Sequence, residues 1–246
     1  MQLGAELERT YHTRDQIEVL LAEPRRLGPD YEPIHSLADD MLVGFKATGR
    51  GSAGTGLDDA LSLLDGARSL GLVERIDWSF RALAFEDLLA LPGYELHLTP
   101  EPETFTTACP PRFARLMARA TRELRVAAEV HEDAFSVGVA LESGLGEVRD
   151  WGWRVVLADV ADSAPALDRF DEVRPDVVQV DLRLPGRRAP DGHPGLQRLL
   201  ELAGDSGAEI MAVGVDSADA LDAALNVGAS MGRGMLYGLP GPLTDA

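Results

Sequence analysis

The sequence has little of three things that mark particular protein classes: cysteine, basic charge and long apolar runs. Cys109 is the only cysteine among the 246 residues, so no disulfide can form within the chain, and a reducing, cytoplasmic compartment is expected. No segment approaches the roughly 20 consecutive apolar residues of a membrane helix. Met1–Gln16 also lacks the apolar core that marks a signal peptide. We therefore expect no membrane association.

Basic residues are outnumbered by acidic ones. The 23 Lys and Arg face 41 Asp and Glu, which gives a formal net charge of -18. Phosphate backbones are bound by clustered Lys and Arg, so we expect no nucleic-acid partner. A free anionic nucleotide would need a locally positive pocket. The composition, with 45% hydrophobic and 26% charged residues, is typical of a soluble globular protein with a sizeable core.

The first third of the chain begins with a predicted helix and continues with a predicted strand pair. Leu3–Leu21 has helical character, and Pro24 and Gly28 end it. The runs Glu32–Ile34 and Met41–Ala47 favour strands joined by a turn, and Gly49–Gly56 has the composition of a loop. Because a short turn joins these two runs, one strand near the N-terminus is expected to run antiparallel to the rest.

The remainder of the chain alternates between helical and strand patterns. Helices are predicted over Leu57–Leu70, Val73–Leu91, Arg112–Ala120, Val137–Trp151, Pro165–Val173, Pro194–Ala203 and Ala218–Val227, and strands over Tyr94–Leu98, Leu124–Val130, Arg154–Ala158, Asp176–Asp181 and Glu209–Val213. This alternation predicts βαβ units, and a count near eight strands favours a closed α/β barrel over an open sheet. We expect a single domain over 1–246, with a leading helix in 1–30 and the barrel in 31–240.

Reactive groups of such barrels lie at the C-terminal ends of the strands. The residues at those ends are Lys46, His97, Glu129, Asp159, Gln179–Asp181 and Val213–Asp216. His131 is expected to point away from Glu129, toward the helical layer. His97, Glu129 and Asp159 are one candidate metal site. The alternative is that His97 is a hydrogen-bonded residue of the barrel mouth.

An ordered series of short motifs resembles the EAL family of cyclic-di-GMP phosphodiesterases. Residues 31–34, YEPI, resemble the YQPI start of an EAL domain, and residues 43–50, VGFKATGR, resemble its VGxEALLR signature. The later matches are EVHE at 129–132 with EITE, LAD at 157–159 with LDD, VQVD at 178–181 with IKID, AVGVDS at 212–217 with AEGVET, and 233–240 with the closing QGxxFGxP. The resemblance implies a TIM-like (β/α)8 barrel of the EAL type.

The same resemblance implies that most metal ligands have been replaced. Family members hold divalent ions with carboxylate and amide oxygens that activate a water. At the corresponding positions this chain has Lys46 for the Glu of EAL, His97 for an Asn, Ala158 for the first Asp of the pair, Gln179 for a Lys and Val213 for a Glu. Glu129 and Asp159 are retained, Arg50 matches a residue near the substrate phosphate, and Asp216 replaces a loop-supporting Glu.

These replacements predict a vestigial site without metal, cofactor or catalytic residues. Alanine and valine offer no lone pair, and a lysine ammonium repels a divalent cation. We expect Lys46 to form an ion pair with Glu129 or Asp159. The glycine-rich DFGTGYSS loop of the family is replaced by residues 159–165, which puts metal binding and the family's dimer contacts in doubt.

Three functions follow from the resemblance. The first is a non-enzymatic regulatory domain, a pseudoenzyme that binds a protein partner; no sensor or cyclase segment is seen, so a stand-alone adaptor is expected. The second is a receptor for cyclic-di-GMP or a related nucleotide, with Arg50 and Lys46 as candidate phosphate-binding residues. The third is a residual phosphodiesterase, which the lost ligands disfavour.

Overall fold

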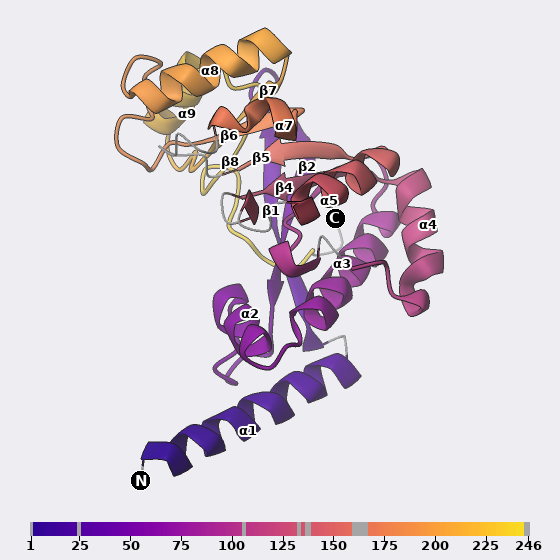
Figure 1. The fold of residues 1–246 in the computed structure, drawn as a ribbon. Helices are drawn as coiled ribbons and strands as arrows, with labels where there is room; N and C mark the ends of the chain where they lie inside the picture. The colour runs from indigo at the N-terminus through magenta and orange to yellow at the C-terminus, as the bar shows by residue number, and fades with distance from the viewer. Residues whose placement is uncertain are drawn as a thin grey trace.

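The computed structural model describes residues 2–23, 26–104, 107–131, 134–135, 139–158 and 167–243. These residues form a closed barrel of eight strands in sequence order, surrounded by helices (Figure 1). The strands are β1 Gly28–Ser36, β2 Leu42–Arg50, β3 Glu95–Leu98, β4 Arg125–Val130, β5 Arg154–Leu157, β6 Val177–Asp181, β7 Glu209–Val213 and β8 Met231–Arg233. The helices are α1 Gln2–Ala22, α2 Ala60–Ser69, α3 Val73–Ala90, α4 Ala114–Glu123, α5 Val139–Asp150, α7 Phe170–Val173, α8 Pro194–Ser206 and α9 Ala218–Asn226, with short 3-10 turns η2 Pro102–Thr104 and η3 Pro111–Phe113.

Strand β1 is antiparallel to both of its neighbours, β2 and β8, whereas the other pairs around the barrel are parallel. The reason is the length of the connections. A tight turn that contains Asp40 in the left-handed region, at φ 58°, joins β1 to β2, and such a turn joins only antiparallel strands. The predicted barrel with one reversed strand near the N-terminus is therefore confirmed.

Strand β2 extends further than its sequence pattern indicates. Gly49 and Arg50, which we predicted to begin a loop, continue the ladder opposite Pro29 and Gly28. A side chain at Gly49 would place its Cβ 2.2 Å from the ring of Phe80 on α3. The glycine thus allows α3 to pack directly on the end of β2, which is why a typical loop residue lies in a strand.

The barrel interior and the outer layer have separate apolar cores. Ile34, Ala127, Val156, Val177, Met211 and Met231, from six different strands, pack together inside the barrel. A larger cluster fills the space between the strands and the surrounding helices. Helix α1 lies at one end of the molecule, where Ile17 and Leu20 pack with Leu63 of α2 (Figure 1). Within the described part of the chain, no helix has the length and apolar character needed to cross a membrane.

Candidate functional site

One layer of inward-facing side chains lies above the barrel core, at the C-terminal ends of the parallel strands. Alternate residues of a strand face the same side, so the position two residues beyond each core residue also points inward. This layer consists of Glu129 above Ala127, Ala158 above Val156, Gln179 above Val177, Val213 above Met211 and Arg233 above Met231, and the reversed strand β1 contributes Glu32. Lys46 joins it because it pairs with Glu32 on one side and His97 on the other.

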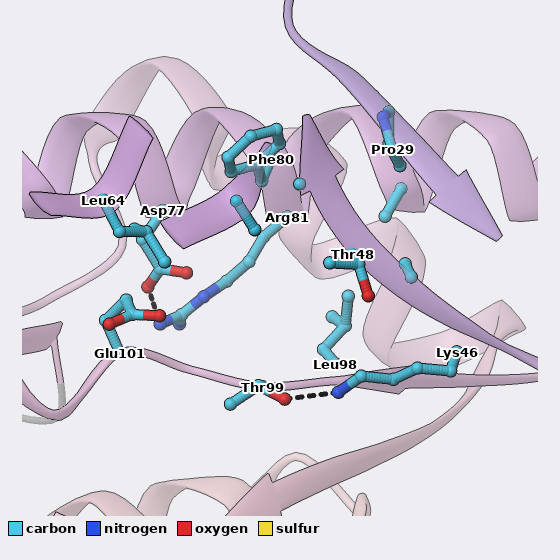
Figure 2. Close-up of a pocket in the computed structure, with 14 residues that line it drawn as sticks. Pro29, Lys46, Thr48, Leu64, Asp77, Phe80, Arg81, Leu98, Thr99 and Glu101 are labelled. Atoms are coloured by element: carbon cyan, nitrogen blue, oxygen red, sulfur yellow. Dashed lines mark hydrogen bonds and ion pairs between the residues drawn. The ribbon is translucent and has the colours of Figure 1, made fainter. Parts of the chain in front are cut away.

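Lys46 and Glu129 form a buried ion pair at the centre of this layer. The Lys46 Nζ lies 2.6 Å from Glu129 Oε2, and the two residues are 7% and 0% exposed. Lys46 also donates to Thr99 Oγ1 at the end of β3 (Figure 2). Burial favours the neutral carboxyl, but the charge of Lys46 and the hydrogen bond with His97 hold the pKa of Glu129 well below its ordinary value. The ion pair that we predicted between Lys46 and Glu129 is confirmed.

His97 connects the two ends of the barrel interior. Its Nδ1 lies 3.2 Å from Glu129 Oε1, and its Nε2 lies 3.3 Å from Glu95 Oε2 at the start of β3. The imidazole is 1% exposed. Glu95 in turn lies 3.4 Å from Arg154 at the start of β5. His97 is therefore hydrogen-bonded, as the second of our two interpretations stated, but it lies within the barrel interior and not only at the mouth.

A second, half-buried ion pair does not follow from the sequence patterns. Arg233 of β8 donates to Glu32 of β1, next to the Lys46–Glu129 pair. Both residues occur in the quoted motifs, but nothing in those motifs indicates that they are partners. The available signal was alternation, because Glu32 and Arg233 each lie two residues from an apolar core position, Ile34 and Met231.

The other predicted positions differ in what they contribute. Ala158 and Val213 are buried and offer no polar side-chain atom. Gln179 is 4% exposed, and its Nε2 has no hydrogen-bond partner among the residues described. Asp216 Oδ1 accepts from the Met235 backbone N–H at 2.8 Å, which agrees with the predicted support of a loop. Asp159 and the replaced loop at 159–165 lie outside the described residues.

The prediction that His131 faces the helical layer is wrong. Its Nε2 lies 3.3 Å from Thr99 Oγ1 and 3.9 Å from Glu129 Oε2. The physical reason is the period of a strand: residues two apart point to the same side, so His131 shares the face of Glu129. His131 is therefore part of the barrel mouth.

The candidate phosphate-binding residues do not share a hollow. Lys46 lines one of about 100 Å³ with Thr48, Arg81 and Thr99 (Figure 2). An adjoining hollow of about 410 Å³ is lined by Arg68, Thr99, Glu101 and His131 but not by Lys46.

Arg50 lines a third hollow, of about 540 Å³, with Tyr31 and Asp87. Its Nε lies 3.0 Å from Asp30 Oδ1, and its side chain is 40% exposed. The structure thus places Lys46 at the centre of the barrel mouth and Arg50 in a separate hollow at the end of β2.

Among the residues that the structure describes, the donor set at the barrel mouth does not fit a divalent metal ion. Such ions need several oxygen ligands, but Glu129 Oε2 lies 2.6 Å from the Lys46 ammonium, and Ala158 and Val213 supply no side-chain oxygen. Among the described side chains, no three of His, Cys, Asp or Glu gather as metal ligands do. The charged residues of this layer instead form two ion pairs, Lys46 with Glu129 and Arg233 with Glu32, and His97 contacts Glu129.

The stability that His97 contributes is expected to depend on pH. Burial opposes a charge on the ring, but hydrogen bonds with Glu129 and Glu95 raise the pKa of His97 above 6.5. The folded protein therefore binds this proton more tightly than the unfolded chain, so the stabilisation is complete below about pH 6.5 and is lost as the pH rises through the folded pKa.

Urea unfolding at about pH 6, below the ordinary histidine pKa of about 6.5, and at about pH 9, above the usual range of histidine titration, checks this. His97→Gln should cost more stability at the lower pH. The control, His12→Gln on the exposed face of α1, should show no such difference. A cost of His97→Gln that is equal at the two pH values would contradict the account.

Comparison with known proteins agrees with the fold and the motif series. The family model for the EAL domain matches residues 14–240. Among solved structures, the EAL domain of Xanthomonas citri FimX, in complex with c-diGMP, has a TM-score of 0.80 at 19% identity, with 98% of each chain covered. The EAL enzyme Bd1971, bound to cAMP and cyclic-di-GMP, has a TM-score of 0.76 at 17% identity over 98% of this chain and 69% of that one.

The phosphodiesterase PaMucR, in a c-di-GMP complex, has a TM-score of 0.70 at 20% identity over 88% of this chain and 97% of that chain. At identities this low, the structural similarity shows a shared fold alone. No curated protein sequence matches the chain.

Proposed function

The chain belongs to the EAL domain family, and from this premise we propose that it is a degenerate member, which does not hydrolyse cyclic-di-GMP and acts by binding. One observation carries the proposal: the Lys46 Nζ lies 2.6 Å from Glu129 Oε2, where the family resemblance expects a glutamate facing a metal. Even at an effective dielectric near 20, two like unit charges about 4 Å apart repel by several kcal/mol. A divalent ion at the same distance from this ammonium would be repelled about twice as strongly.

The neighbouring residues support the same proposal. The loss of oxygen ligands at Ala158 and Val213 weakens any metal site further, because each missing ligand removes part of the coordination shell. Restoring one ligand leaves the others absent. The proposal therefore rests on several positions of one layer, with Lys46 as the position of greatest effect.

The main candidate is a regulatory domain that binds a protein partner. The second candidate is a receptor that binds cyclic-di-GMP without cutting it, and one observation favours it: FimX, Bd1971 and PaMucR are each known in complex with this nucleotide. Arg50 is the candidate phosphate-binding residue in this case, because its side chain is partly exposed and lines an open hollow.

Calorimetric titration with cyclic-di-GMP, with and without magnesium, tests the proposal and separates the two candidates. A protein-binding domain should give no heat. A receptor should bind equally with and without magnesium, and Arg50→Gln should weaken binding, whereas Arg198→Gln on the exposed face of α8 should not. Binding that requires magnesium would contradict the proposal, because it would show that a divalent ion is held beside Lys46.

A further inference from the structure

Helix α4 and the residues around it carry an unusual density of positive charge. Arg112, Arg115, Arg119, Arg122 and Arg125 all lie within fifteen residues, with Glu123 as the only acid among them. All five arginines are exposed. The chain as a whole has a net charge of -18, so this segment is opposite in sign to the rest of the molecule.

The arginines form a stripe because of their spacing. Arg115, Arg119 and Arg122 are separated by four and three residues, which places them on one face of an α-helix. The opposite face is apolar: Met117 and Ala120 are buried against the outer core layer. In Figure 1, α4 lies on the outside of the molecule beside α3. Because the arginines are exposed and Met117 and Ala120 are buried, the arginine stripe faces solvent.

Contacts within the chain explain the positions of only some of these arginines. Arg119 Nε lies 2.9 Å from Glu123 Oε2, and the Arg112 guanidinium stacks on the ring of Phe113. Arginines in the last turn also favour the helix dipole. Arg115 lies near the start of the helix, where that dipole is unfavourable to it. Within the described part of the chain, no hydrogen bond or ion pair involves Arg115 or Arg122.

From this charge pattern we propose that the arginine stripe on α4 is a docking surface for an acidic segment of a partner protein. The stripe from Arg115 to Arg122 spans about 10 Å along the helix, which matches carboxylates on three successive turns of a partner helix, about 5.4 Å apart. Each guanidinium can bind a carboxylate through two parallel hydrogen bonds. The proposal deepens the proposed function, because it gives the chemistry of the partner.

Nucleic acid fits the surface less well. Its phosphates extend beyond the stripe, so a long strand would meet the acidic surface of the rest of the chain. A short acidic peptide segment is affected mainly by the stripe, because charges more than about 10 Å away are screened at 0.1 M salt. The size of the stripe therefore favours an acidic protein segment.

The experiment is fluorescence anisotropy with a short labelled oligoglutamate peptide at about 0.1 M salt, where the screening length is about 10 Å. The wild-type chain should bind the peptide, and Arg115→Glu/Arg122→Glu should weaken binding about tenfold, a change of about 1.4 kcal/mol. The control is Arg14→Glu/Arg198→Glu. It changes the net charge equally on α1 and α8, away from α4, and should have less than about a twofold effect.

Thermal unfolding checks that each variant is folded, and Arg115→Gln/Arg122→Gln provides a milder pair that should weaken binding in the same direction. No binding of the peptide to the wild-type chain would overturn the proposal, as would equal losses in the stripe and control variants. Tighter binding of a labelled oligothymidine than of oligoglutamate would also overturn it, in favour of nucleic acid. These results do not depend on catalysis: turnover of cyclic-di-GMP would reject the proposed function and leave the docking result to stand by itself.

Discussion

Replacing Lys46 with methionine is expected to lower the free energy of unfolding by about 3 kcal/mol, because the change leaves the Glu129 carboxylate buried without its main counter-charge. Glu129 is fully buried, and Lys46, which is the only lysine of the chain, is 7% exposed. Removing one member of a buried pair costs much more than the pair contributes in total, since the remaining charge keeps its full desolvation penalty. His97 and Arg233 offset part of this cost.

The double variant Lys46→Met/Glu129→Gln should recover most of the lost stability. The glutamine carries no charge, and its side-chain oxygen still accepts a hydrogen bond from His97. A matched control is Arg50→Met, which removes the cation of the half-exposed pair with Asp30 and should cost less than about 1 kcal/mol. Urea unfolding at pH 7 measures all three variants. Two results would contradict this explanation. The first is that Lys46→Met lowers the free energy of unfolding no more than Arg50→Met does, and the second is that the double variant is no more stable than Lys46→Met.

Changing Lys46 back to the glutamate of the family motif should not restore hydrolysis of cyclic-di-GMP. The change would remove a misplaced positive charge and supply one carboxylate. It would also place that carboxylate beside Glu129, and Ala158 and Val213 would still offer no oxygen. Hydrolysis by metal-activated water requires the ion, the water and the phosphodiester to be held together, so these parts act as a unit. Any gain from the single reversion is therefore expected to stay far below ordinary enzyme turnover.

The Lys46→Glu variant also shows whether the introduced carboxylate restores metal binding or only removes the lysine charge. Lys46→Glu should be less stable than Lys46→Met, because two buried carboxylates then face each other without a bound cation. Added magnesium or manganese should not reverse this loss if the layer cannot hold a divalent ion. A large increase in thermal stability of Lys46→Glu with either metal would show that one position controls metal binding, which would weaken the argument from Ala158 and Val213.

Much of the fold could be predicted from the sequence because its signals are local. Alternating helical and strand patterns indicated the order of elements, and the short turn predicted between Ile34 and Met41 indicated the reversed strand. The extent of β2 could not be predicted in this way. Gly49 has the composition of a loop residue, and it belongs to a strand because Phe80, distant in the sequence, packs directly on it.

The site was only partly predictable for similar reasons. The ion pair of Lys46 with Glu129 followed from placing two motifs at the same barrel mouth. The pair between Glu32 and Arg233 joins residues 201 positions apart, which meet only when β8 closes the barrel on β1. No periodicity in either segment specifies this partnership. The orientation of His131, by contrast, could have been predicted, because residues two apart on a strand point to the same side. Our prediction placed His131 on the wrong face.

The most direct test of the central claim is an assay for linear dinucleotide released from cyclic-di-GMP with saturating magnesium or manganese. It compares the natural chain, Lys46→Glu and an ordinary EAL phosphodiesterase measured in parallel. We expect no product above the enzyme-free control from the natural chain, and far less product from Lys46→Glu than from the enzyme measured in parallel. Metal-dependent turnover within the roughly 1–10³ s⁻¹ that is typical of enzymes, by either protein, would contradict the claim that the Lys46–Glu129 ion pair marks a site unable to use a metal.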